Sequence, residues 1–224
     1  MNARYTAART SLRTAAIMLV FSLLFTAAMA FTYTLTRPAI EASELAEKMR
    51  LINEVLPAGS YDNDLLGDVL HLGPTPELGL SRGGAVYRAR RNGEAVALLI
   101  EAEAADGYAG RIQLVLAVDT DGRVSGVRVT AHKETPGLGD YIDPQKDRNK
   151  ERPWIGQFAG ITHDQVDPAV WKVKRDGGVF DARAGATISA RAVTNATGRA
   201  LRWAVAHRDA LFAAETGSTL PPQE

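Results

Sequence analysis

The chain has 224 residues, with 26 Lys and Arg residues balanced by 26 Asp and Glu residues and with no Cys. This length allows one sizeable domain and an additional segment. The formal net charge of zero gives no electrostatic support for binding to nucleic acid. The lack of Cys excludes disulfides, thiolate-bound iron–sulfur clusters and Cys-based zinc sites. Any redox chemistry must therefore come from a bound organic cofactor.

Residues 14–36 carry no charge, and a helix of about 20 apolar residues spans a bilayer. Arg4, Arg9 and Arg13 precede this run, so the positive-inside rule predicts a cytoplasmic N-terminus for residues 1–13 and places the rest of the chain outside. The alternative is a cleaved signal peptide, because Ala28-Met29-Ala30 resembles a processing site. The uncharged run continues beyond that site, which favours an uncleaved transmembrane helix over residues 14–36.

Residues 37–60 are predicted to form an amphipathic helix that connects the membrane span to the domain, with Pro57-Ala58-Gly59 ending it. Its apolar side chains recur at near-helical intervals and alternate with Glu and Lys. They are Ile40, Leu45, Met49, Ile52, Val55 and Leu56. Docking on a partner subunit and simple packing explain this pattern equally well.

The rest of the chain predicts an α+β domain over residues 61–215, with a mainly antiparallel sheet and flanking helices. Residues 61–84 give no firm prediction. Strand-like runs occupy residues 85–89, 95–102, 112–118 and 124–131, and Asn92-Gly93 and Thr120-Asp121-Gly122 supply hairpin turns. The alternation at Val127, Val129 and Ala131 fits a sheet with one covered face.

Three further expectations concern the end of the chain. Trp171, Val173 and Val179 are the last strand candidates. A helix-like pattern runs from Ser189 to Phe212. Residues 216–224 are expected to form a flexible tail.

One stretch carries a candidate reactive group. In Asp181-Ala-Arg-Ala-Gly185-Ala186-Thr187-Ile-Ser189, small residues leave the backbone open to a flat ligand, and Thr187 offers a hydroxyl that can act as a nucleophile with help. The alternative is a strand-to-helix turn in which Thr and Ser serve as caps. Spacing alone favours the cap.

A second stretch, His132-Lys-Glu134-Thr135-Pro-Gly137-Leu138-Gly139-Asp140, predicts a tight turn, because Pro fixes φ and Gly tolerates positive φ. The two stretches, together with Trp171–Asp181, resemble the FMN-binding domain found in the G subunit of the Rnf-type electron transport complex. A close relative is the C subunit of the sodium-translocating NADH:quinone reductase. The resemblance covers residues 107–193 and the N-terminal anchor.

The resemblance implies an FMN attached to Thr187 through a phosphoester bond. It also implies that the turn and the Gly-Ala-Thr-x-Ser stretch contact this cofactor. The residues so assigned are Glu134, Thr135, Gly137, Leu138, Gly185, Ala186 and Ser189. No metal site is expected, because the four His residues are scattered without helical metal spacing.

By the same resemblance, the chain is an electron-relay subunit of a membrane-bound, ion-translocating ferredoxin:NAD oxidoreductase and not a stand-alone enzyme. Its expected partners are the other subunits, the membrane and a flavin transferase that attaches the FMN. The expected location is the bacterial inner membrane, with the main domain in the periplasm. Two alternatives stay open: the C subunit of the quinone reductase, and a non-redox, membrane-anchored binding module.

Overall fold

The computed structural model describes the backbone of residues 3–57 and 59–220, and the chain divides into two units, Met1–Met49 and Arg50–Glu224. The first element, α1, is a single helix from Ala3 to Val55. Pro38 lies inside it. The expected division into a span and a separate connecting helix is therefore not marked by a break, because a helix can continue through one Pro at the loss of one backbone hydrogen bond. Ala58, in the expected turn, lies outside the described residues.

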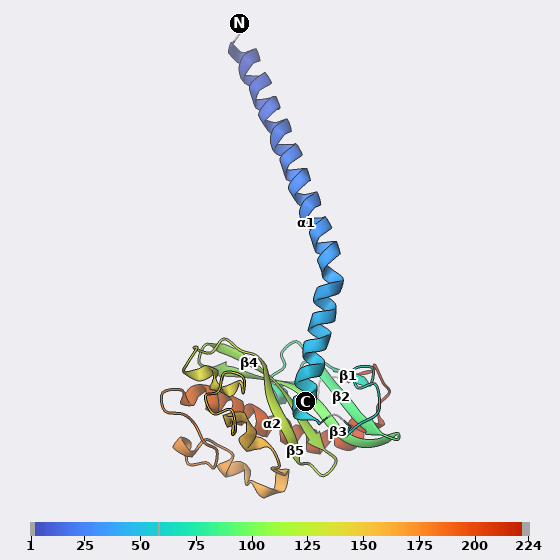
Figure 1. Ribbon diagram of the computed structural model, residues 1–224, viewed down its shortest axis with the longest axis vertical. Coiled ribbons are helices and arrows are strands. Elements are labelled where there is room, and N and C mark those ends of the chain that lie inside the picture. Colours follow the sequence, from blue (N-terminus) through green and yellow to red (C-terminus); the bar gives the residue numbers. More distant parts are fainter. Residues whose placement is uncertain (1–2, 58, 221–224) are drawn as a thin grey trace. The chain divides into compact units, whose positions relative to one another are not determined.

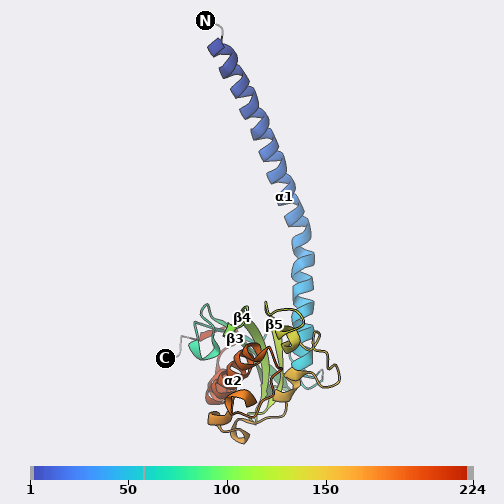
Figure 2. The ribbon, with the colours of Figure 1, turned by 90° about the vertical axis from the view of Figure 1, so that its left-hand side faces the viewer.

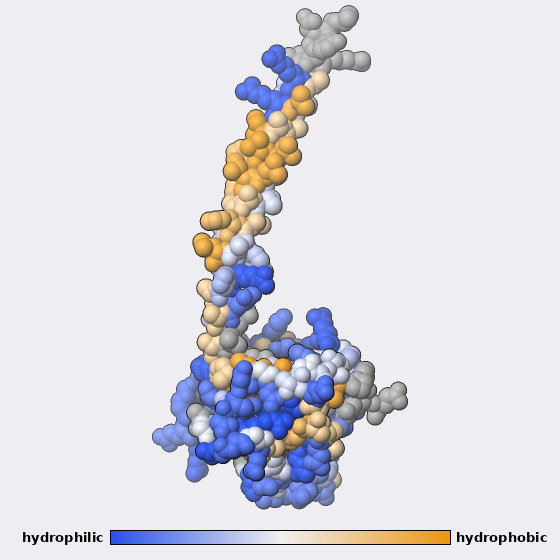
Figure 3. Space-filling model, turned by 90° about the vertical axis from the view of Figure 1, so that its right-hand side faces the viewer, coloured by the Kyte–Doolittle hydropathy of each residue, from blue (hydrophilic) through white to orange (hydrophobic). Residues whose placement is uncertain are grey.

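The first unit consists of an apolar helix. Within the described part of the chain, one segment, Ala7–Ser43, is long and apolar enough to cross a membrane by length and composition, with a mean hydropathy of 2.2 in its most apolar window. Its large apolar side chains are exposed, for example Leu19, Phe25 and Phe31. Figure 3 shows this stretch as the apolar band on the helix. It is a candidate membrane span.

The second unit contains a six-stranded sheet in the order β5-β4-β3-β2-β1-β6 (Figure 1). All neighbouring pairs are antiparallel except β1 and β6, which are parallel, so the prediction of a mainly antiparallel sheet is confirmed. At the predicted Asn92-Gly93 turn both residues have positive φ, 51° and 82°, as a two-residue hairpin requires. The strands are β1 (Val69–Leu72), β2 (Gly84–Arg91), β3 (Glu94–Gly107), β4 (Gly110–Asp119), β5 (Val124–Ala131) and β6 (Thr219–Leu220).

Helix α2 (Thr187–Ala213) covers one face of the sheet, across β3 and β4 (Figure 2). Its buried side chains share a core with Leu98 and Ile100 of β3. The expectation of one covered face needs correction, because the intervening Leu99 is also completely buried. The other face is covered by residues that follow Met49, among them Ile52, Val55, Leu56 and Leu65.

Gly126 on β5 shows how closely this second layer lies. A Cβ placed there would be 2.9 Å from the Cα of Val55, so only glycine admits this approach. Both layers together bury the central strands, which explains why β3 is apolar on both faces and does not alternate.

Between β5 and α2 the chain forms loops and five short 3-10 helices: η2 (Gly139–Ile142), η3 (Trp154–Phe158), η4 (His163–Gln165), η5 (Pro168–Val170) and η6 (Lys174–Asp176). A further one, η1 (Pro76–Leu78), precedes β2. The expected strand at Trp171, Val173 and Val179 is wrong. Only an isolated bridge joins Val173 to Phe180, because the chain reverses at Gly177, where φ is 82°.

Beyond α2, the expectation of a flexible tail also needs correction. Thr219 and Leu220 form β6 and pair with His71 and Leu72 of β1. His71 N–H donates to the Ser218 carbonyl at 2.9 Å, and Gly217 N–H donates to the Val69 carbonyl at 2.7 Å. These bonds hold the segment to the sheet. Residues 221–224 of the predicted tail lie outside the described residues.

The C-terminal end of α2 is capped by the side chain of Arg88 on β2, a residue that is 2% exposed. Its guanidinium donates to the carbonyls of Leu211 and Ala214, to the Thr216 hydroxyl and to Asp68. Arg90 donates to Asp68 and to the Phe212 carbonyl at 2.9 and 3.0 Å. Carbonyls that the helix leaves without an N–H partner thus receive charged donors.

Candidate functional site

The predicted tight turn at residues 135–139 is present. The Thr135 carbonyl accepts from the N–H groups of Leu138 and Gly139, both at 3.1 Å. Gly137 has a φ of 76° and donates to the Asp140 carboxylate at 2.9 Å. Gly139 is required for a different reason, because a Cβ there would lie 2.6 Å from the Ser189 Oγ. The turn therefore lies directly against the start of α2.

Glu134 joins three separate segments. Its side chain is buried, with Oε1 accepting from the Ala109 N–H at 3.0 Å and Oε2 accepting from the Ser189 hydroxyl. Ala109 belongs to the turn between β3 and β4, and Ser189 belongs to the first turn of α2. One buried carboxylate thus fixes the hairpin tip, the tight turn and the helix start relative to one another. A buried carboxylate needs such donors to offset its desolvation.

Thr187 is the first residue of α2. Ala186 occupies the N-cap position and provides no side-chain cap. The Thr187 hydroxyl is therefore not the cap that spacing alone favoured. It accepts from Nη1 of Arg175 at 3.4 Å, a long contact, and the residue is 9% exposed. Gly185 has a φ of 85° and is exposed, so the chain enters the helix through a bend that only glycine adopts readily.

The loop that leads into Thr187 is anchored by Tyr141. The Tyr141 hydroxyl accepts from the Arg183 N–H at 3.1 Å and donates to the Ala186 carbonyl at 3.3 Å. The guanidinium of Arg183 lies 4.6 Å from the centre of the Tyr141 ring. Burial raises the pKa of Tyr141 above its usual value, so the hydroxyl keeps its proton and can donate to Ala186.

Asp147 holds Arg183 in this position. Its side chain is completely buried and accepts from Arg183 and from the N–H groups of Asn149 and Trp154, at 2.8 and 2.7 Å for the two N–H groups. Burial alone would raise the pKa of Asp147, but these hydrogen bonds outweigh it and the pKa lies below the usual value. The carboxylate therefore stays charged and paired at neutral pH.

A cleft of about 240 Å³ lies between the tight turn and the start of α2, and we call it the first cleft. It contains six of the predicted site residues: Glu134, Thr135, Leu138, Gly185, Ala186 and Ser189. Thr187 lies between Ala186 and Ile188, which both line it. The two sequence stretches, separated by about fifty residues, thus meet at one surface. Tyr108, Gly139 and Ile188 complete the lining.

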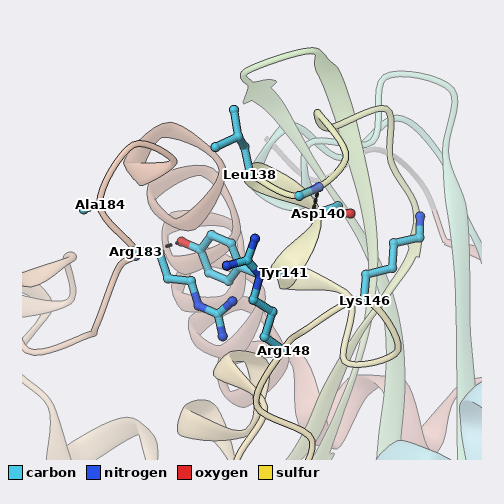
Figure 4. Close-up of a pocket in the computed structure, with 8 residues that line it drawn as sticks. Leu138, Asp140, Tyr141, Lys146, Arg148, Arg183 and Ala184 are labelled. Carbon is cyan, nitrogen blue, oxygen red and sulfur yellow. Dashed lines mark hydrogen bonds between the residues drawn. The ribbon is translucent and has the colours of Figure 1, made fainter.

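A second cleft of about 260 Å³ adjoins the first and shares Leu138 with it. Gly137, the remaining predicted contact, lines this cleft and not the first. Figure 4 shows Arg148 and Arg183 beside the Tyr141 ring, with Lys146 across the cleft near Asp140. The second cleft is therefore cationic, whereas the first is lined by small, apolar and neutral polar groups around Glu134.

Sequence reasoning missed Arg175 and the anchoring residues Tyr141, Asp147 and Arg183. Arg175 lies within the Trp171–Asp181 stretch, but its spacing to Thr187 gives no sign that the two side chains meet. Asp147 lies in a loop rich in charged residues, and the sequence of such a loop does not show which carboxylate is buried in an ion pair and which is solvated. In the described part of the chain, no group of three or more His, Cys, Asp or Glu residues could hold a metal ion.

Two regions of the chain match known protein families. Residues 107–202 match the FMN-binding domain family, and residues 1–55 match the RnfG N-terminal region. A protein from Pseudomonas aeruginosa, named as the G subunit of an ion-translocating oxidoreductase complex, is 41% identical over 92% of this chain and 94% of its own length. Its namesake from Pseudoalteromonas atlantica is 39% identical over 88% of this chain and 90% of its own.

Among solved structures, NqrC from Shewanella oneidensis matches 58% of this chain and 60% of its own, with 24% identity and a TM-score of 0.41. The long, nearly full-length sequence matches and the FMN-binding domain decide the assignment. The chain belongs to the family of G subunits of the ion-translocating oxidoreductase complex.

Proposed function

We propose that this chain relays electrons within a membrane-bound, ion-translocating ferredoxin:NAD oxidoreductase complex, through an FMN joined to Thr187 by a phosphoester bond. The observation that carries the proposal is the position of the Thr187 hydroxyl. It belongs to the first residue of α2, between Ala186 and Ile188, which both line the first cleft, and it accepts from Arg175. Family membership supports the FMN and the complex. The position of Thr187 supports the covalent link.

The three hydroxyls in the first turns of α2 differ in their availability. Ser189 is 1% exposed, and its hydroxyl is already bonded to Glu134. Thr194 is completely buried. Thr187 keeps only the long contact with Arg175, and its neighbours Gly185 and Ile188 are exposed. Of these three hydroxyls, the one on Thr187 is the most accessible to an incoming phosphate.

The surroundings of Thr187 also suit the charge of a phosphoester. An N-terminal helix end presents free N–H groups and a partial positive charge, which favour an anion. The guanidinium of Arg175 adds a full positive charge at the same point. Helix α2 is 27 residues long, so its N-terminal end carries a full helix dipole.

The shape of the first cleft explains why a covalent bond is useful. Ligand pockets usually measure about 300–1,000 Å³, and the first cleft, at about 240 Å³, is smaller than that. A shallow cleft buries little of a flat ring and holds it weakly. A bond to Thr187 keeps the cofactor in place where free diffusion would lose it.

The FMN, when bound, supplies a group that accepts and releases electrons. The chain contributes the surroundings: Leu138 and Ile188 give apolar contacts, Thr135 adds a polar contact, and the buried Glu134 keeps the turn against α2. Hydrogen bonds and nearby charge set the potential of such a cofactor. The uncharged span over residues 14–36 offers no ion path of its own, so ion movement belongs to the rest of the complex.

We further propose that the N-terminus lies in the cytoplasm and the domain after residue 60 in the periplasm of the inner membrane, anchored by the apolar segment of α1. Arg9 and Arg13 on the N-terminal side of the uncharged run motivate this orientation. Attachment of the FMN then requires a flavin transferase, since the one described hydrogen-bond partner of the Thr187 hydroxyl is the guanidinium of Arg175, which cannot act as its base. Protease added to the outside of spheroplasts should cleave the domain, and protection of the domain would reverse the orientation.

Thr187→Ala tests the central proposal, with Thr187→Ser as a control that keeps a hydroxyl. The chain is produced together with a flavin transferase and digested with trypsin. The mass of the peptide of residues 184–191 is then measured by mass spectrometry. The wild-type peptide should carry the mass of FMN, and the Ala variant should carry none. Since Thr187 is not a side-chain cap, the Ala variant should lose at most about 1 kcal/mol of stability. An unmodified wild-type peptide from a transferase-containing host would reject the proposal.

A further inference from the structure

The second cleft carries two cations that lack a carboxylate partner among the described residues. Three basic side chains around the rest of the site are paired, Lys174 with Asp181, Arg183 with Asp147 and Arg191 with Asp176, while Arg175 contacts the Thr187 hydroxyl. Lys146 and Arg148 are exposed, and within the described part of the chain neither makes an ion pair with Asp or Glu. The lining of the second cleft holds three cations, Lys146, Arg148 and Arg183, and one carboxylate, Asp140, so it carries a local excess of positive charge although the chain as a whole is neutral.

His132 lies beside Lys146 but does not provide a hydrogen-bond acceptor for its ammonium group. The Lys146 Nζ lies 3.3 Å from His132 Nε2, while the Glu134 N–H donates to His132 Nδ1 at 3.1 Å. Burial and the charge of Lys146 lower the pKa of His132, so the ring is neutral at pH 7. A neutral ring has one acceptor nitrogen, and Nδ1 already accepts from Glu134. Nε2 therefore carries the proton, and the ammonium of Lys146 still lacks an acceptor.

Asp140, the one carboxylate in the lining of the second cleft, makes no ion pair with Lys146 or Arg148 within the described residues. Its carboxylate is buried in the floor of the second cleft and accepts from the Gly137 N–H within the tight turn. Arg183 is held back by Asp147 and lies against the Tyr141 ring. The exposed cations of the cleft are thus Lys146 and Arg148, whose side chains Figure 4 shows in different positions around it.

We propose that the second cleft docks a carboxylate-bearing segment of another subunit of the same complex, the one that exchanges electrons with the FMN. This inference rests on the proposed function. Leu138 lines both clefts and is 55% exposed, so a partner seated in the second cleft also covers the edge of the first. Electron exchange requires such a close approach to the cofactor.

The composition of this surface fits a protein partner. Arg and Tyr are enriched at protein interfaces, where exposed apolar groups lie beside charged ones. Leu138, which lines the second cleft together with the two cations, and Ile188, which lines the adjoining first cleft, are both exposed apolar residues. Exposed cations of this kind chiefly raise the association rate and select the partner, which suits a contact that forms and breaks repeatedly.

A zero-length carbodiimide cross-linker tests the proposal, because it couples an amine only to a carboxylate in direct contact. Membranes that contain the full chain with the rest of its complex are treated and digested, and the linked peptides are identified by mass spectrometry. Lys146 should be joined to an Asp or Glu of another subunit. Arg148→Glu, which leaves Lys146 intact, should reduce this cross-link about tenfold. Arg91→Glu, an exposed cation on the far half of the sheet, should leave it unchanged.

Other results would overturn the docking site. These are a Lys146 linked only within its own chain, a Lys146 linked to a lipid carboxylate, and an equal effect of Arg148→Glu and Arg91→Glu. The same digest reports residues 184–191. A missing FMN mass there with the Lys146 cross-link present would reject the proposed function alone, whereas flavinylated Thr187 without the cross-link would reject the docking site alone.

Discussion

The two ends of α2 are built in opposite ways. At the C-terminal end, Arg88 and Arg90 bring charged donors to the helix carbonyls, and Asp68 holds both guanidinium groups. At the N-terminal end the N-cap is an alanine without a side-chain bond, and the first hydroxyl, on Thr187, makes one long contact. Charged side chains thus satisfy carbonyls at the C-terminal end, whereas no side chain caps the N–H groups at the N-terminal end, where we propose that the cofactor is attached.

Loss of Arg88 should have the largest effect. Arg88→Met removes the donors to the carbonyls of Leu211 and Ala214 and leaves the largely buried Asp68 with Arg90 as its one remaining ion-pair partner among the described residues, so the free energy of unfolding should fall by about 3–5 kcal/mol. Denaturant titration followed by tryptophan fluorescence in detergent measures it. Arg91→Met, exposed on the same strand, should change it by less than about 0.5 kcal/mol. If both variants lost the same free energy of unfolding, the contacts of Arg88 with the end of α2 would not be the source of the loss.

A smaller loss is expected at the open end, at Gly139. In Gly139→Ala the new Cβ would lie 2.6 Å from Ser189 Oγ and 2.9 Å from Glu134 Oε2, so the tight turn must shift away from α2. Such overpacking costs about 1–3 kcal/mol. The same measurement serves here, with Gly156→Ala as the control, because a Cβ at Gly156 meets nothing within 4 Å. If Gly139→Ala left the free energy of unfolding unchanged, the tight turn would not depend on close contact with α2.

Arg175 should affect the cofactor and not the fold. Arg175→Gln removes the positive charge beside the Thr187 hydroxyl, and we expect flavin attachment to slow about tenfold, equivalent to about 1.4 kcal/mol. The free energy of unfolding should change by less than about 0.5 kcal/mol, since Arg175 has no other described bond. The fraction of modified 184–191 peptide over time is the measurement. Lys172→Gln, an exposed cation nearby, is the control, and an equal slowing there would indicate only general charge attraction.

The smallest of these effects is expected from acid, which acts on Asp68 at the C-terminal end of α2. Burial alone would raise the pKa of Asp68, but hydrogen bonds from Arg88, Arg90 and Thr216 outweigh it, and the pKa lies below its usual value. A lowered folded-state pKa contributes stability that is complete above the unfolded value of about 3.9 and is lost as the pH falls through the folded value. The free energy of unfolding should therefore be similar at pH 7 and pH 5, and it should decline only below about pH 4. Asp68→Asn should flatten this decline, and an unchanged slope would exclude Asp68 as its source.

Local patterns predicted much of this molecule. Strands β2 to β5 and helix α2 follow from apolar periodicity and from turn residues such as Asn92 and Gly93, which need positive φ. Strand β1 and its partner β6 could not be predicted in this way. They are short, and their pairing joins His71 to Thr219, a contact that only the folded chain creates. The double covering of the sheet depends likewise on the distant Val55.

The site was predictable to the extent that it lies in two short motifs. Glu134 and Ser189 belong to different motifs, and the sequence indicates that both are near a cofactor, but their direct bond depends on the turn and the helix meeting in space. Arg175 and Asp147 act through long side chains or buried contacts, whose direction sequence spacing does not encode. The unpaired state of Lys146 depends in turn on the tautomer of His132, and therefore on one backbone N–H group.

Strand β6 also has a consequence for how the chain is made. Thr219 pairs with His71, 148 positions earlier, and its segment satisfies the N–H groups of His71 and Gly73 at what would otherwise be an open sheet edge. Open edges are sites of pairing between molecules. At a synthesis rate of about 5–20 residues per second, this edge stays uncovered for roughly 7–30 s in every new chain. During that interval the nascent domain depends on its surroundings to prevent aggregation.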